Sequence, residues 1–438
     1  MRPLSFYRII AILSGLALFV LLAAPTGPLE RKTKHVEKTA AGGRPVRLKA
    51  ESAELTVRAG TGTEVKVTAD LAFASRDKKW MAAIDQRFDV AIRETAAGLE
   101  IEPTGPVQDD SWDGAHFFRF EVSRSYDLQL VLEVPKGTRL DLDNRYGDVS
   151  VTGVEGALEV ALTSGNLTAT NVRGGAEIDN RYGDVELSDL EGDLVLEAGS
   201  GSVEIAGLTG GARLRNQYGN LVLSRVTGPV DIAVTSGEVE VREAGGAVSV
   251  QDTYGAVTIE GAAGDVTVST QSSPIRLERI GGRVNIDGEY GSVEVAEVAG
   301  AVDVVSGSGT VKVAGAAREV SIRNRYAGVS VDGAGGAVTI SNESGEVAVA
   351  GLSGAALTAR HRVETRYGSI DFEWPAAAPA PAFTLECTYG DLESDFPGRL
   401  IEGDATDVLS APASDPSSTA ALELSAVSGS VRLKKARP

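Results

Sequence analysis

The chain is poor in cysteine, histidine and basic residues, and each shortage excludes a class of protein. A single cysteine, Cys387, cannot form an internal disulfide. Three His with that one Cys are too few for a zinc site, so the sequence predicts no cofactor and no metal site. Lys and Arg number 42 against 61 Asp and Glu, a formal net charge of -19. Nucleic acid is therefore excluded as a partner, because phosphate binding needs a high density of basic residues.

Proline is not raised, although glycine is abundant: the 438 residues include 16 Pro and 51 Gly. No Gly-X-Y register appears, which excludes a collagen. Hydrophobic residues make up 42% of the chain, enough to build a core, which excludes wholesale disorder. The length predicts two or three globular domains unless the chain is a repeat array, which can grow without adding domains.

The amino terminus carries a short apolar run over residues 9–24, preceded by Arg2 and Arg8 and followed by Pro25. Residues 1–30 therefore read as a signal peptide or an N-terminal membrane anchor. No small-x-small cleavage site ends the run cleanly. This favours an uncleaved anchor that enters the membrane through residues 9–24, with a cleaved signal peptide as the alternative.

A strict repeat fills the centre of the chain. Six tyrosines recur every 36 residues, and six serines lie halfway between them. The tyrosines are Tyr146, Tyr182, Tyr218, Tyr254, Tyr290 and Tyr326; the serines are Ser164, Ser200, Ser236, Ser272, Ser308 and Ser344. Gly follows five members of each set, so the unit has 18 residues and starts alternately with Tyr-Gly and Ser-Gly. Twelve such units run to about residue 360 without an insertion.

The pattern inside each unit predicts short strands. Counting the Tyr or Ser as zero, apolar residues fall at +3, +5, +8, +12 and +14, and Gly often falls near +10. The paired positions have the two-residue period of a strand, and the glycines suit turns. One such coil cannot bury its own apolar side chains, whereas stacked coils can. The pattern therefore predicts an all-β, single-stranded parallel β-helix (a β-solenoid) of 18-residue coils. Twelve coils about 4.8 Å apart make a rod of roughly 58 Å. A right-handed coil is favoured because the unit lacks the hexapeptide spacing of left-handed ones.

Four regions follow from this reading. Residues 1–30 are the signal or anchor, and residues 44–126 form an N-terminal cap with the first coils. Within that cap, residues 46–71 read as a coil and residues 73–125 as an insertion that covers its open edge. The regular β-helix spans 127–360, and irregular C-terminal coils with Pro/Ala and Ser/Pro loops span 361–433.

The segment LEVPKGTRLDLDNRYGDVSVTGVEGALEVALTSGNL resembles the DUF4097 group of adhesin-like bacterial domains. That group shows a PKG turn followed by repeated units of the form xGDVxVxxxxGxVxV. The resemblance covers roughly residues 44–433. It implies a β-solenoid at the bacterial cell envelope, extracytoplasmic and either membrane-anchored or secreted, with a role in adhesion or envelope-stress signalling. No catalytic residues are associated with the group, so none are carried over to this chain.

The tyrosine column is the candidate binding site, and two interpretations stay open. Each ring could fold over the adjacent Ser-Gly coil and shield it, since aromatic rings contribute most when buried. Alternatively, an exposed ridge of Tyr, Arg and Asn could stack on an extended polymer such as a glycan. The candidate residues are Tyr146, Tyr182, Tyr218, Tyr254, Tyr290, Tyr326, Arg145, Arg181 and Arg325.

Other motifs favour structural roles. Asp109–Gly114 resembles the first half of a calcium-binding loop. Position 12 of such a loop needs a carboxylate, but here it falls on Phe120, so an acidic surface loop is expected. His35, His116 and His361 lie far apart in the sequence, and none is beside a nucleophile motif. Catalysis is therefore not predicted.

The sequence thus predicts an extracytoplasmic, non-catalytic, adhesin-like binding or structural module at the bacterial cell envelope. Its partner would be an envelope or surface glycan or a membrane protein. The alternative is an accessory or scaffold protein in envelope-stress signalling, and a polysaccharide-active β-helix enzyme is less favoured.

Overall fold

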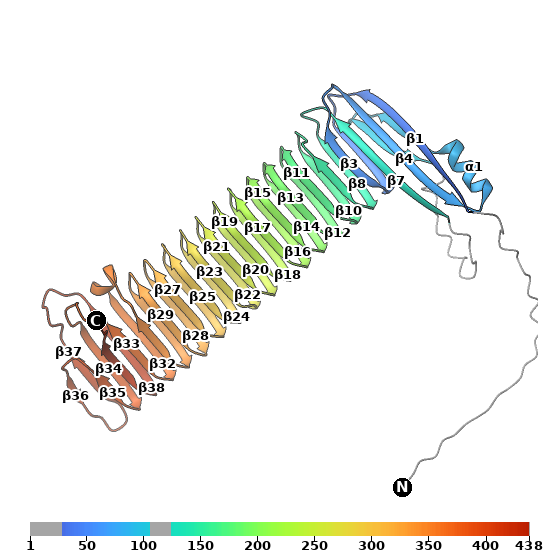
Figure 1. The fold of residues 1–438 in the computed structure, drawn as a ribbon. Helices are drawn as coiled ribbons and strands as arrows, with labels where there is room; N and C mark the ends of the chain where they lie inside the picture. The colour runs from blue at the N-terminus through green and yellow to red at the C-terminus, as the bar shows by residue number, and fades with distance from the viewer. Residues whose placement is uncertain (1–28, 106–123, 438) are drawn as a thin grey trace, which may run out of the picture.

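The computed structural model describes residues 29–105 and 124–437, which form an all-β rod (Figure 1). Each regular coil contributes one strand to each of two parallel sheets that face each other across an apolar core. The predicted parallel β-solenoid of about twelve regular turns is therefore confirmed. No helix within these two ranges is long and apolar enough to cross a membrane, and the apolar run at 9–24 lies outside them.

The regular strands alternate between the sheets. Sheet B contains β8 (Leu140–Tyr146), β10 (Leu158–Ser164), β12 (Ala176–Tyr182), β14 (Leu194–Ser200), β16 (Ala212–Tyr218), β18 (Val230–Ser236), β20 (Val248–Tyr254), β22 (Val266–Ser272), β24 (Val284–Tyr290), β26 (Val302–Ser308), β28 (Val320–Tyr326) and β30 (Val338–Ser344). Sheet A contains β9 (Val149–Thr152), β11 (Leu167–Arg173), β13 (Val185–Glu191), β15 (Val203–Thr209), β17 (Leu221–Val226), β19 (Val239–Ala244), β21 (Val257–Ala262), β23 (Ile275–Ile280), β25 (Val293–Val298), β27 (Val311–Ala316), β29 (Val329–Ala334) and β31 (Val347–Ala350).

The ladder register equals the sequence period. Val160 pairs with Leu142 in one neighbouring coil and with Ile178 in the other, 18 residues away in each direction. Equivalent apolar side chains therefore stack in buried columns, because alternate residues of a strand point to the same face.

A left-handed residue explains the three-residue step between the apolar positions +5 and +8. The residue at +7 has positive φ in all twelve regular coils: Gly153, Asn171, Asp189, Gly207, Arg225, Glu243, Gly261, Arg279, Glu297, Gly315, Gly333 and Gly351. This kink adds one residue to the alternation and returns the next apolar side chain to the core, as at Leu190 and Val226.

The glycine that follows most of these Tyr and Ser residues allows the coils to approach closely at one corner. Gly183 has φ +139, and a Cβ there would lie 2.1 Å from the carbonyl oxygen of Gly165 in the preceding coil. A larger residue would push the coils apart, which accounts for the Tyr-Gly and Ser-Gly pairs.

At the amino-terminal end the sheets continue through antiparallel strands. In sheet A, β1 (Glu30–Ala41) pairs with β4 (Glu64–Ser75), which pairs with β7 (Ser125–Val134). In sheet B, β5 (Asp89–Glu94) pairs with β6 (Leu99–Thr104). Helix α1 (Lys78–Arg87) begins at Asp77, whose carboxylate accepts from the Lys79 and Trp80 amides, and it buries Met81 and Ile84. The prediction of a coil over residues 46–71 was wrong in its second half. Strands β2 (Val46–Ser52) and β3 (Glu54–Ala59) form a coil, but β4 runs antiparallel to its neighbours in sheet A.

Chain order and spatial order differ at both ends of the rod. The coil β2–β3 lies between the coils β6–β7 and β8–β9. At the other end, the last coil of the sequence lies between two earlier ones. The elements there are η1 (Gly354–Thr358), β32 (Arg360–Tyr367), β33 (Ile370–Trp374), β34 (Ala382–Tyr389), β35 (Leu392–Ser394), β36 (Arg399–Ile401), β37 (Asp407–Ala411), β38 (Ala421–Ser428) and β39 (Val431–Lys435). The coil β38–β39 separates β32–β33 from β34–β35, and β37 and β36 extend sheet B antiparallel.

Candidate functional site: a tyrosine ridge

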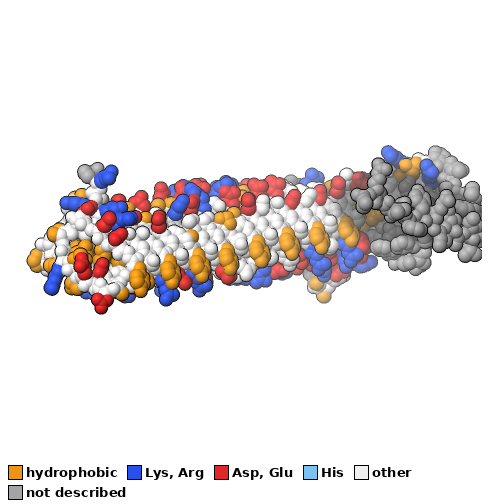
Figure 2. All heavy atoms as spheres, turned by 90° about the horizontal axis from the view of Figure 1, so that it is seen from below, with side chains coloured by type: hydrophobic (Ala, Val, Ile, Leu, Met, Phe, Trp, Pro, Cys, Tyr) orange, Lys and Arg blue, Asp and Glu red, His pale blue; other side chains and the backbone are white. Residues whose placement is uncertain are grey.

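The predicted tyrosines are exposed. Their side chains lie at the ends of sheet B strands, and two further tyrosines, Tyr367 and Tyr389, occupy the same position. All eight are between 50% and 68% exposed. We call this set the tyrosine ridge: Tyr146, Tyr182, Tyr218, Tyr254, Tyr290, Tyr326, Tyr367 and Tyr389. Figure 2 shows exposed hydrophobic side chains as a line of separate patches along the rod. The rings are therefore not packed away between the coils.

Serine and tyrosine alternate without a break along this corner. The ladder begins with Ser52 against Tyr146 and continues through the regular coils to Ser344 against Tyr367. Beyond them, Ser428 pairs with both Tyr367 and Tyr389, so the displaced last coil keeps the alternation. Because coils stack about 4.8 Å apart, the rings recur roughly every 9.6 Å, with the small Ser side chain between them.

The asparagines do not belong to the ridge, contrary to the Tyr, Arg and Asn ridge considered from the sequence. Asn144, Asn180, Asn216 and Asn324 are buried. Asn180 donates its amide to the carbonyl oxygens of Gly165 and Gly183, at 3.2 and 3.1 Å. A side chain two residues before the Tyr points inward, so it satisfies backbone carbonyls at the corner.

The residue before each Tyr faces outward and sets the local charge. Arg145 pairs with Glu51 at 2.6 Å, Arg325 with Glu343 at 3.8 Å, and Arg181 is exposed. The Arg366 guanidinium lies 6.0 Å from the centroid of the Tyr367 ring. In the middle of the rod the same position is Gln217, Thr253 and Glu289. The ridge is thus flanked by arginine towards both ends and by neutral or acidic residues at its centre.

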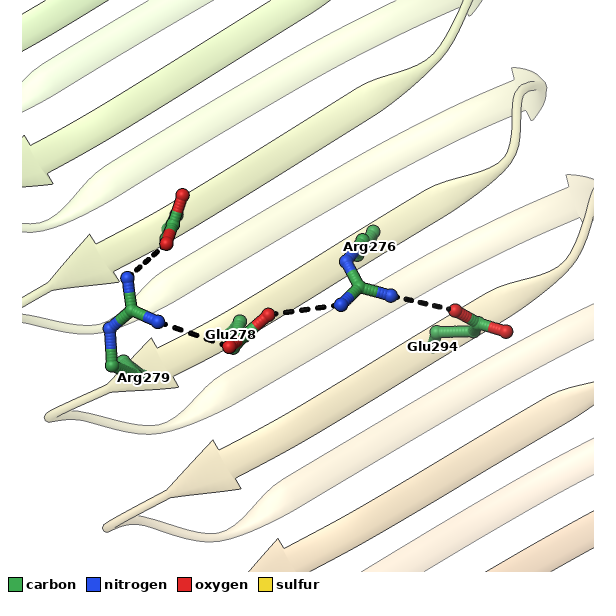
Figure 3. Close-up of polar contacts among 5 residues, drawn as sticks. Arg276, Glu278, Arg279 and Glu294 are labelled. Carbon is green, nitrogen blue, oxygen red and sulfur yellow. Dashed lines mark hydrogen bonds and ion pairs between the residues drawn. The ribbon is translucent and has the colours of Figure 1, made fainter.

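The outer face of sheet A carries networks of paired charges. Arg276 bridges Glu278 and Glu294 at 3.0 and 3.1 Å, and Arg279 bonds Glu278 at 3.0 Å (Figure 3). Arg279 also bonds Glu260 in the preceding coil, and this hydrogen bond lowers the pKa of the Glu260 carboxyl. These contacts join neighbouring coils and neutralise charge.

The histidines and the cysteine have structural partners. Burial lowers the pKa of His361, whose ring accepts from the Val338 amide at 3.2 Å and donates to the Ala356 carbonyl at 2.8 Å. His35 lies 2.6 Å from Asp70 on exposed strands of the cap. Cys387 is buried and donates to the Gly429 carbonyl. Within residues 29–105 and 124–437, no group of three or more His, Cys, Asp or Glu could hold a metal ion. His116 and the 109–114 loop lie outside these residues.

The model of one protein family, Toastrack DUF4097, matches residues 46–262 and 247–434. The chain belongs to the Toastrack DUF4097 family. This confirms the resemblance noted in the sequence. No curated protein matches this Toastrack chain.

The solved structures to which this Toastrack protein is similar are distant from it. A candidate cell adhesion protein from Clostridium sporogenes is 7% identical over 92% of this chain and 100% of its own, with a TM-score of 0.17. A candidate adhesin from Parabacteroides distasonis is 14% identical over 62% of this chain and 98% of its own, with a TM-score of 0.19. A candidate lipid-binding protein from the same species is 13% identical over 76% of this chain and 96% of its own, with a TM-score of 0.17.

Proposed function

We propose that this Toastrack protein is a non-catalytic, adhesin-like binding module at the bacterial cell envelope, and that its tyrosine ridge binds an extended envelope or surface glycan. The observation that carries the proposal is the unbroken Tyr and Ser alternation, which gives half-exposed rings at a constant spacing of roughly 9.6 Å.

Regular spacing matters because a polymer presents the same chemical group again and again. A tyrosine offers an apolar ring face and a polar hydroxyl, which suits a sugar ring with both apolar and hydroxyl surfaces. The ladder of main-chain hydrogen bonds fixes the spacing of the Tyr backbone positions before binding, so little backbone entropy is lost. Several weak contacts on one chain then add through high effective concentration.

The proposed extracytoplasmic location rests on the amino terminus. The apolar run at 9–24, with basic residues before it, suits an anchor or an export signal. An anchored rod would hold its ridge away from the membrane surface.

The test is co-sedimentation of the full chain, in mild detergent, with isolated bacterial cell walls and with extracellular polysaccharide. The triple variant Tyr182→Ala, Tyr218→Ala, Tyr254→Ala should lose binding, since three consecutive rings are removed from exposed positions without touching the core. The matched triple Tyr→Phe variant should keep most of it, because the rings remain. Thermal melting checks that both variants fold. Binding that survives in the alanine variant would show that the ridge is not the binding surface. No binding by the wild type would exclude the glycan ridge and favour a membrane protein partner.

A further inference from the structure

A hollow of 810 Å³ lies on the outer face of sheet B beside the centre of the ridge. It spans the strands from β14 to β24. Its lining includes the outward residues that directly precede the Tyr or Ser of the ridge corner: Gln217, Thr235, Thr253 and Gln271. It also includes the outward residues two positions before these: Ala233, Gln251 and Ser269.

Small outward side chains produce this hollow. Ala233 and Ser269 flank Gln251 in one column across adjacent strands. At one end of the hollow the column continues with Arg215 and Glu197, which pair at 3.3 Å, and at the other end with Asp287. Charged side chains therefore bound the hollow at both ends, and the short side chains of Ala233 and Ser269 leave space on either side of Gln251.

The middle of the lining is rich in uncharged hydrogen-bonding groups, and most of its charged residues lie towards its ends. Gln217, Gln251 and Gln271 each offer an amide that can donate and accept, and the Thr and Ser hydroxyls do the same. Arg215 is already paired with Glu197. Asp287 and Glu289 add negative charge at the far end, which would repel an anionic ligand.

We propose that this hollow is the subsite that selects the glycan, and that it takes an uncharged chain of pyranose sugars lying along the rod. The inference rests on the proposed function, because Gln217 and Thr253 of the lining directly precede the ridge residues Tyr218 and Tyr254. Amides and hydroxyls match sugar hydroxyls, which need partners that both donate and accept. The arginines near the ends of the ridge, Arg145, Arg181, Arg325 and Arg366, are absent from this central stretch.

The experiment measures binding of four hexasaccharides to the full chain in mild detergent by isothermal titration calorimetry. Two are uncharged, built of β-linked glucose or N-acetylglucosamine. One is anionic, built of galacturonate, and one is cationic, built of glucosamine. We expect an uncharged hexasaccharide to bind more tightly than the anionic one, which Asp287 and Glu289 repel. It should also bind more tightly than the cationic one at a salt concentration that screens the attraction of these two exposed carboxylates.

Two pairs of substitutions locate the site. Ala233→Gln with Ser269→Gln fills the hollow with the residue type already present at Gln251, and it changes no charge. Ala206→Gln with Ser224→Gln makes the same chemical changes on the outer face of sheet A. The first variant should weaken binding of the uncharged hexasaccharide at least tenfold, while the second should bind as the wild type does.

The outcomes separate the two proposals. If the filled variant binds normally while Tyr218→Ala with Tyr254→Ala loses binding, the ridge stands and the hollow is not its subsite. If a charged hexasaccharide binds most tightly, the assignment of an uncharged glycan is overturned. If none of the four binds, the inference is overturned, and wall co-sedimentation then decides whether the ridge itself survives.

Discussion

Asp252 accepts a hydrogen bond from the Ser273 hydroxyl of the next coil, and both side chains are buried. Asp252 occupies the inward position that Asn144, Asn180 and Asn216 fill elsewhere, and Ser273 stands where most coils have glycine. An Asn amide donates to two corner carbonyls, whereas a carboxylate cannot donate to them. The serine supplies the donor that the acid needs, so the two exceptions to the repeat compensate each other.

Replacing Asp252 with Asn should stabilise the rod at neutral pH. Burial raises the pKa of the Asp252 carboxyl, so the folded state binds its proton more tightly than the unfolded state does. The wild type therefore loses stability as the pH rises from the ordinary Asp range of about 3.9 through the raised value. The amide would restore up to two hydrogen bonds, a gain of roughly 1–2 kcal/mol at pH 7. Chemical denaturation of both proteins across pH 4 to 8 measures the difference, which should shrink towards the acid end.

The reverse change provides the control. Asn180→Asp places an acid where the following coil offers Gly201 instead of a serine. It should destabilise the rod at pH 7, and the loss should diminish as the pH falls. Equal stability of this variant and the wild type at pH 7 would contradict the role assigned to the inward amides.

Gly183→Ala should destabilise the rod strongly. The new Cβ would lie 2.1 Å from the Gly165 carbonyl oxygen, and the residue has φ +139. Overpacking and left-handed strain together cost roughly 2–5 kcal/mol. Gly137→Ala is the matched change, since φ is +79 but nothing lies within 4 Å of the added Cβ. It should cost only the left-handed strain, about 1–2 kcal/mol. Guanidinium unfolding of both variants tests the comparison, and similar losses would show that close approach of the coils is unimportant.

The left-handed position at +7 should accept glycine with a gain in stability. Arg225 has φ +55, and Arg225→Gly should stabilise by about 0.5–1 kcal/mol through relief of that strain. Arg279 has φ +58 but pairs with Glu278 and Glu260, so Arg279→Gly should gain less. Because salt screens exposed pairs, the two gains should converge at high ionic strength in thermal melts. A gap that persists in high salt would argue against the ion pairs as its cause.

The regular coils were predictable because every coil repeats the same local pattern. The step from +5 to +8 was visible in the sequence and marks the left-handed kink at residues such as Asn171. The order of the terminal coils was not predictable, because the pairing of Ser428 between Tyr367 and Tyr389 is non-local and leaves no periodic signal. The exposure of the ridge was also undecided, since a ring at a strand end can turn either way. The inward role of Asn180 was missed, although its two-residue offset from Tyr182 places it on the buried face.

Removal of residues 421–438 should unfold more than the residues removed. Strands β38 and β39 are last in the sequence, yet they lie inside the rod between β32–β33 and β34–β35. Their loss deletes an internal coil and removes a pairing partner from each of β32, β33, β34 and β35. It also exposes the apolar columns around Val363 and Leu385, which are fully buried. Direct pairing of β34–β35 with β32–β33 would place Tyr389 against Tyr367, and the Ser and Tyr alternation would be lost. Hydrogen exchange read by mass spectrometry should therefore show lost protection across 382–411, while the coils before residue 344 keep theirs, because each coil of a solenoid contacts only its neighbours.

A deletion of the 412–419 loop joined by a short Gly and Ser linker leaves every strand in place and should preserve protection. Full protection of residues 382–411 in the truncated chain would show that β34–β35 can pair directly with β32–β33. The last coil would then not be needed to keep the ridge in register.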